Sequence, residues 1–241
     1  MPLSLPDYHA RTARVREVVG GQLVAVWSGL GAYRDANVDR FVRIAVPKVR
    51  AGQYATARLT AQYLGGPVLP RAEIAAVRPV DPRVEYRRPA VKLYTLLAAG
   101  VSYADALPQA TRLVTDLAAT DLQLALRAQS QASLAAQGHT RYRRVLTGRE
   151  DCDRCRLASL NVYSTSDLLP IHSHCDCTVE PIRAESPTVD LGSLALSADR
   201  AEQVAAGASP ESLVAIREHG ELGPVVVWAS DQFTGPDDIA A

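Results

Sequence analysis

Apolar residues recur at helical spacing through most of the first 137 residues. In residues 7–31 they recur three or four positions apart, which predicts an amphipathic helix. The residues on this apolar face are Val15, Val18, Val19, Leu23, Val26, Trp27 and Leu30. A second helix is predicted from Asp35 or Asn37 to about Tyr63. It should stop at Gly65-Gly66-Pro67, because glycine adopts a left-handed cap and proline cannot continue a helix.

The next stretch, residues 67–89, reads as a linker because it contains five prolines and scattered charge. Helix is predicted again over residues 90–99, ending at Gly100. Ser102 and Asp105 then resemble a capping box, with Asp in place of the usual Glu. They open the longest predicted helix, which runs to about residue 137.

The pattern changes after Gly138. The segment 139–151 alternates in part and predicts a short strand and turn. We expect a loop to about residue 196, short helices over 197–206 and 209–218, and a last strand over 225–228. The fold class predicted is therefore a mainly α N-terminal domain, 1–138, with a Pro-rich linker at about 67–89. A small α+β zinc-knuckle module, 139–241, follows it.

Charge divides the chain unevenly. Residues 1–150 hold 21 Lys+Arg and 11 Asp+Glu, a balance of 21 − 11 = +10. Residues 151–241 hold 5 and 15, a balance of 5 − 15 = −10, so the chain as a whole is neutral. A basic half suits nucleic acid or an acidic protein surface. The alternative is that the two halves neutralise each other, within one molecule or between neighbours.

The four cysteines lie within 26 residues, 152–177. No stretch has the roughly 20 apolar residues of a membrane span, and the N-terminus lacks the apolar region of a secretory signal. We therefore expect no membrane contact and a reducing, cytoplasm-like setting. Clustered cysteines in that setting favour a metal site over disulfides.

The cysteines and histidines have metal-ligand spacing. Cys152 and Cys155 form a Cys-x2-Cys turn that directs two thiolates to one point. Sixteen residues later the candidates are His172, His174, Cys175 and Cys177. Cys175 with His172 would give a site of three cysteines and one histidine, which we prefer, and Cys175 with Cys177 an all-cysteine site. His174 is the weakest candidate, and spacing alone leaves the choice open.

We expect the ion to be a structural zinc, because thiolate-rich ligation quenches the Lewis acidity that hydrolysis needs. Disulfides, unligated cysteines and a catalytic zinc remain as alternatives, the last with Asp151, Asp153, Asp176 or Glu180 as general base. Hydrolase and nucleotide-binding motifs are not found in the sequence. The catalytic set is therefore empty, and the chain is predicted not to be an enzyme.

Four arginines lie just before the cysteines: Arg141, Arg143, Arg144 and Arg149. On a strand, Arg141 and Arg143 would share one face while Arg144 points away. They are candidates for contact with nucleic acid or with another protein. A solvated or ion-paired face is the simpler interpretation.

The order of these parts resembles the Mu F-like minor head proteins, the head-morphogenesis family of tailed bacteriophages, in the form found in phages of actinobacteria. The resemblance rests on TDLQLALRAQS, YRRVLTGREDCDRCRLAS, the tyrosine of NVYSTSDLLPIH, and HCDC, and it covers roughly residues 110–241. The Pro-x-His-x2-Cys-x-Cys segment after Cys-x2-Cys is its most specific part. The closing segment EHGELGPVVVWASDQFTGPDDI also resembles tails of these proteins.

The resemblance implies a virion protein at the portal vertex inside the head, assembled in the bacterial cytoplasm. Its partners would be the portal protein and the major capsid protein, with packaged double-stranded DNA as a further contact. Relatives are often described as capsid maturation proteases, but no residue here supports a proteolytic centre. A cysteine- or metal-dependent protease and a zinc-containing DNA-binding protein are the alternative functions.

Overall fold

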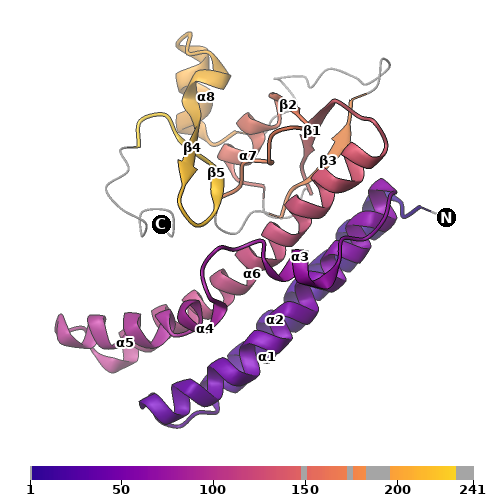
Figure 1. Cartoon of the computed structure of the whole chain (residues 1–241). Helices are drawn as coiled ribbons and strands as arrows, with labels where there is room; N and C mark the ends of the chain where they lie inside the picture. Colours follow the sequence, from indigo (N-terminus) through magenta and orange to yellow (C-terminus); the bar gives the residue numbers. More distant parts are fainter. Residues whose placement is uncertain (1, 148–150, 173–175, 183–195, 232–241) are drawn as a thin grey trace.

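The structure is a computed structural model that describes residues 2–147, 151–172, 176–182 and 196–231. Two long helices open the chain, α1 (Leu5–Ser28) and α2 (Asp35–Leu64). They run side by side in opposite directions (Figure 1). Both predicted helices are confirmed, although α1 starts and ends a few residues earlier than expected. Gly65 and Gly66 end α2 with φ of 87° and 93°, the left-handed region that glycine tolerates.

The predicted linker contains two short helices, α3 (Arg71–Ala75) and α4 (Pro82–Glu85). Next come α5 (Arg88–Ala98) and the longest helix, α6 (Tyr103–Ala136). Ser102 is confirmed as the N-cap of this helix, since its side chain accepts a hydrogen bond from the Asp105 backbone N–H at 3.2 Å and its hydroxyl donates to the Asp105 carboxylate at 2.5 Å.

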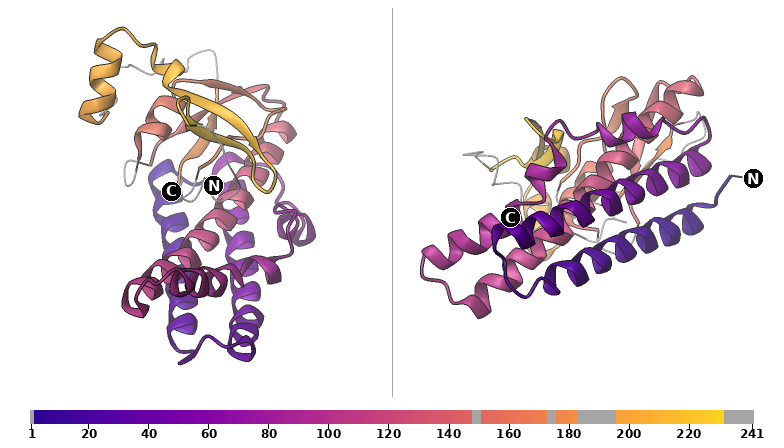
Figure 2. Two further views of the ribbon diagram at one scale, coloured as in Figure 1. Left: turned by 90° about the vertical axis from the view of Figure 1, so that its left-hand side faces the viewer. Right: turned by 60° about the horizontal axis from the view of Figure 1, so that its bottom comes forward.

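The main core lies where α1, α2 and α6 pack together (Figure 2). Leu23, Trp27 and Phe41 are fully buried there, and Val114 enters from α6. The Trp27 and Phe41 rings meet edge to face at 5.2 Å between centroids, a geometry that aromatic pairs favour. The helices are tightly packed at Gly52, where an added Cβ would lie 2.7 Å from Val19 Cγ2.

A small sheet packs on the C-terminal half of α6 (Figure 1). Its central strand is β1 (Arg141–Val145), flanked by β2 (Val162–Ser164) and β3 (Thr178–Pro181) in antiparallel pairings. Between β1 and β2 lies the helix α7 (Asp153–Ala158). The loop expected up to residue 196 was therefore wrong in part: β2 and β3 form by pairing with β1, and α7 packs against the last hairpin.

The chain closes with α8 (Ala198–Ala205), a 3-10 turn η2 (Pro210–Leu213), and the hairpin β4 (Val214–His219) and β5 (Gly223–Trp228). The predictions of α8 and β5 are confirmed. The helix predicted over 209–218 was wrong, because only its first residues turn and the rest pair with β5. The described residues are thus mainly helical, with small antiparallel sheets at the C-terminal end, as the predicted fold class required.

Buried charges join the linker to α6 and to the β4–β5 hairpin. Arg78, 8% exposed, donates to Asp121 of α6 at 2.7 Å, to Glu85 of α4 at 3.1 Å and to Glu221 of the β4–β5 turn at 3.3 Å. Tyr86 donates to the other Asp121 oxygen at 2.8 Å. The Pro-rich stretch is therefore a fixed crossing, held by charge pairs that water hardly reaches.

Candidate metal centre

Two separate segments bring three candidate ligands together. Cys152 is the residue before α7 and Cys155 lies within its first turn, so one helical start presents both thiols. His172 follows Ile171, whose backbone N–H donates to Pro224 O at 3.2 Å and whose carbonyl accepts from Val226 N–H at 2.8 Å. The β4–β5 hairpin thus holds the histidine segment in place opposite α7.

The three side chains meet at one point. His172 Nε2 lies 3.2 Å from Cys152 Sγ and 2.9 Å from Cys155 Sγ. All three ligand atoms lie within 4.8 Å of one another. Ligands roughly 2.1–2.3 Å from a tetrahedral zinc lie roughly 3.5–3.8 Å apart. The two nitrogen–sulfur distances are shorter than this, so the three donors would move slightly apart around an ion. Two sulfurs and an imidazole nitrogen that converge on one point are donors that zinc prefers, so these residues form a candidate metal site.

The surroundings favour thiolate at this point. A hydrogen bond from Cys155 lowers the pKa of Cys152 to about 3, and a bond and positive charge from His172 add to this effect while burial opposes it. Arg144 places Nη1 3.7 Å from Cys155 Sγ. A thiolate is the form of cysteine that binds metal, so the site's electrostatics agree with its geometry.

Of the candidates for a fourth ligand, the structure describes only Cys177. Cys177 is fully buried and packs in one cluster with Cys152 and Cys155. Its Sγ also lies within 4.8 Å of carboxylate oxygens of Asp151 and Asp176. Cys175 and His174, which the sequence also offered, lie outside the described residues. The structure groups His172, and not Cys177, with Cys152 and Cys155 as donors that could hold an ion. Because Cys175 belongs to both predicted sets and lies outside the described residues, the choice between His172 with Cys175 and Cys177 with Cys175 stays a prediction.

The arginines of β1 have different surroundings. Arg141 is exposed, whereas Arg143, on the same face, forms an ion pair with Glu180 of β3. Arg144 lies on the opposite face, as predicted, and is only 2% exposed. Its Nη2 donates to Pro170 O, so it braces the segment that leads to His172. A buried guanidinium cannot reach a phosphate, and Arg149 lies outside the described residues.

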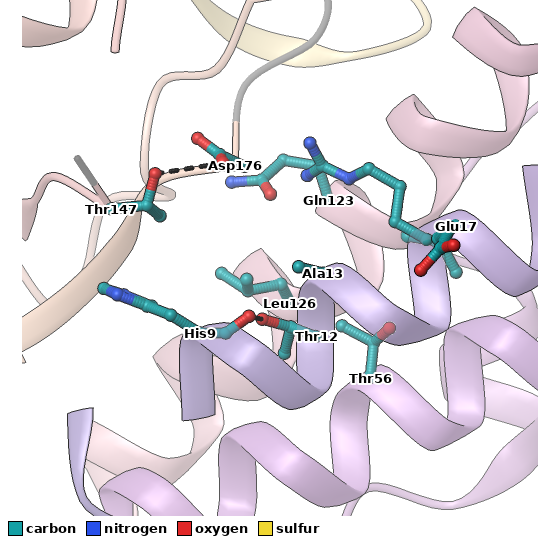
Figure 3. Close-up of a pocket in the computed structure, with 11 residues that line it drawn as sticks. His9, Thr12, Ala13, Glu17, Thr56, Gln123, Leu126, Thr147 and Asp176 are labelled. Atoms are coloured by element: carbon teal, nitrogen blue, oxygen red, sulfur yellow. Dashed lines mark hydrogen bonds between the residues drawn. The ribbon is translucent and has the colours of Figure 1, made fainter. Parts of the chain in front are cut away.

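A cavity of about 200 Å³ lies between α1, α2, α6 and the loops around β1 and β3 (Figure 3). Thr147 donates to Asp176 at 3.0 Å at its upper edge. His9 faces them from α1, and burial lowers its pKa against the opposing effect of Asp176 and Asp151. The lining residues are His9, Thr12, Ala13, Arg16, Glu17, Thr56, Leu122, Gln123, Leu126, Thr147 and Asp176.

Sequence reasoning missed this cavity and the role of Arg144. His9 appeared isolated, because the residues it faces follow it by more than a hundred positions. Only the tertiary packing of α1 against the sheet brings them together. The burial of Arg144 could have been predicted from one feature of the sequence. Side chains alternate along a strand, so Arg144 lies on the face opposite to the exposed Arg141, which is the face toward the core.

Comparison with known proteins places the chain in a class. One protein-family model, described as VG15 protein, matches residues 3–193. The chain therefore belongs to this family, which is a family of phage proteins. The match ends before α8 and the β4–β5 hairpin. Neither the curated proteins nor the solved structures gave a match to the chain. Among the residues that the structure describes, no helix is long and apolar enough to cross a membrane.

Proposed function

We propose that this phage protein is a Mu F-like minor head protein, bound at the portal or capsid interior, whose C-terminal module is held by a structural zinc ion. The observation that carries the proposal is the meeting of Cys152, Cys155 and His172 from two separate segments. The family match supports its phage origin. The order of the arginine-rich strand, Cys-x2-Cys turn and His-Cys-x-Cys segment supports the head-protein assignment.

The site favours a structural role because it is built into a small module. The β1–β2–β3 sheet has short strands, and the cluster of Leu134, Tyr142, Tyr163, Leu169 and Val179 is its main apolar support. A zinc ion bound with an apparent free energy of roughly 10–16 kcal/mol would stabilise such a module about as much as the burial of those five side chains, at roughly 1.5–3 kcal/mol each. Two thiolates and a buried imidazole suit a closed site better than one that activates water.

The proposed location follows from the resemblance and not from the metal. The protein would join the head during assembly in the bacterial cytoplasm, contacting the portal protein and the major capsid protein. We propose that it has no enzymatic activity, since the ligands of the centre are those that a protease mechanism would otherwise need.

Metal analysis tests the site directly. Purified protein should contain about one zinc per chain, and His172→Asn or Cys155→Ser should lower that content and the protein's melting temperature together. His139→Asn is the matched control, because His139 lies outside the ligand group. A wild-type protein free of metal after expression in zinc-supplemented cells would rule out the structural ion.

Head assembly tests the function. Heads assembled with Cys155→Ser should lack the protein, since a misfolded module cannot dock, whereas His139→Asn should enter at the normal copy number. Normal incorporation of Cys155→Ser together with uncleaved capsid protein would favour the protease alternative instead.

A further inference from the structure

The solvent face of α2 carries a line of arginines. Arg40, Arg43, Arg50 and Arg58 are all exposed. At 100° per residue they lie within an arc of about 80°, and the 18 steps from Arg40 to Arg58 span about 27 Å at 1.5 Å per residue. From Arg40 to the end of α2 the helix has no acidic residue. We call these four residues the α2 arginine row.

The row differs from the arginines that form ion pairs, because no described carboxylate pairs with it. Arg14, Arg87, Arg143 and Arg156 each form an ion pair with a nearby carboxylate, and Arg78 forms three. No ion pair joins the row to any described residue. An unneutralised line of like charge repels itself, so it destabilises α2 unless an anion binds there.

A fifth guanidinium extends the row. Arg71 of α3 lies over the ring of Tyr54, 4.1 Å from its centroid. Tyr54 occupies the same side of α2 as the row, between Arg50 and Arg58. Stacking on an aromatic ring orients a guanidinium while leaving its N–H groups able to donate. The α3 segment thus adds a positioned cation to a face that α2 already makes basic.

We infer that the α2 arginine row binds the phosphate backbone of double-stranded nucleic acid. A phosphate backbone offers anions along a line whatever the base sequence, and arginine matches phosphate in two-point hydrogen bonds. An acidic protein surface is the competing partner in the test. The surface lies on α2, whereas the metal module packs on α6, so both could be used together (Figure 1).

The nucleic-acid contact of the proposed function would therefore lie on α2 and not on the arginines of β1. This inference rests on the proposed function only for the origin of the duplex, which would be the packaged genome. A binding assay with purified protein does not depend on incorporation into heads, so the two ideas can fail separately.

The test measures binding to a labelled duplex of about 30 base pairs by fluorescence anisotropy. Four phosphate contacts predict a slope of about −3.6 for log K against log salt, which is roughly a 150-fold loss between about 50 and 200 mM salt. Affinity should be equal for duplexes of unrelated sequence. Replacing all four row arginines by Gln should remove most of the slope and weaken binding at the lower salt by more than about tenfold.

The control variant makes the same change of net charge elsewhere, with Arg11, Arg83, Arg112 and Arg217 replaced by Gln. All four are exposed and lie outside the row, so this variant should keep most of the affinity and the slope. Circular dichroism melts confirm that both variants fold. Equal losses in the two variants, a flat salt response, or binding to polyglutamate but not to duplex would each overturn the inference.

Discussion

Arg78 offers the sharpest test of how the fold is held together, because it is buried among carboxylates. Its guanidinium contacts Asp121, Glu85 and Glu221, and the side chains of the first two are 4% and 1% exposed. Replacing it by Met keeps much of its apolar volume but leaves two buried carboxylates without their main counter-charge. Breaking a buried charge pair in this way costs roughly 3–5 kcal/mol.

The lower end of that range applies here. Tyr86 still donates to Asp121, and Arg88 still pairs with Glu85 at 2.8 Å, so neither carboxylate loses every partner. We expect Arg78→Met to lower the free energy of unfolding by about 3 kcal/mol. For a chain of this length that corresponds to a fall of roughly 6–12 °C in melting temperature. Urea unfolding followed by circular dichroism measures the change.

The loss should depend on pH, with a definite sign. Burial already raises the pKa of Glu85, and the charge of Arg78 opposes that rise. Removing Arg78 therefore raises the pKa of Glu85 further. The folded variant then binds a proton more tightly than the unfolded chain, so its stability falls as pH rises above the ordinary glutamate range. The deficit relative to wild type should be smaller at about pH 5.5 than at about pH 7.5.

Arg83→Met is the matched control. Arg83 lies in the same segment but is exposed, and exposed substitutions usually change stability by less than about 0.5 kcal/mol. The reasoning fails if Arg78→Met costs no more than this control, or if its deficit grows as the solution is acidified.

Three further changes test other parts of the fold. Gly52→Ala should destabilise the helix core by about 1–3 kcal/mol through overpacking, since the new Cβ would approach Val19 and Leu122. Gly21→Ala, with no neighbour within 4 Å, should stabilise α1 by up to about 1 kcal/mol. A Gly52→Ala variant that melts as high as Gly21→Ala would contradict the close approach of the helices. Ser102→Ala should cost about 1 kcal/mol by removing the cap of α6, and an unchanged urea midpoint would show the cap to be energetically neutral. Chelation should lower the melting temperature of the wild type while leaving a His172→Asn variant unaffected, and an equal effect on both would place the chelator's action elsewhere.

The sequence predicted the long helices well and the short elements poorly, for a physical reason. In α1, α2 and α6 the apolar spacing repeats over many turns, so the pattern alone identifies the buried face. The segment 214–219 has no such repetition. It forms a strand because it pairs with β5, and that pairing cannot be read from the local sequence pattern. The short α7, β2 and β3 were missed on the same grounds.

Some residues of the candidate site could likewise be predicted from local sequence, whereas the contacts between distant segments could not. Cysteine spacing is a local property, so the convergence of Cys152 and Cys155 could be predicted, with His172 among a few possible partners. The buried network of Arg78 could not, because its members come from the linker, from α6 and from the last hairpin. A Pro-rich composition made that linker resemble a free connection, although its charges fix it in place.

The long helix α6 belongs to both ends of the molecule. Val114, in its first half, packs in the helix core, whereas Leu124 and Leu134, further along, pack against the hairpin and the small sheet. It is therefore one continuous helix, about 50 Å long for its 34 residues, that connects the two cores. One residue inserted between the two halves of α6 would rotate the second half, and the cysteine-containing module packed on it, by about 100° relative to α1 and α2. Geometry at a docking surface would then be lost without any change in the residues that make the contact.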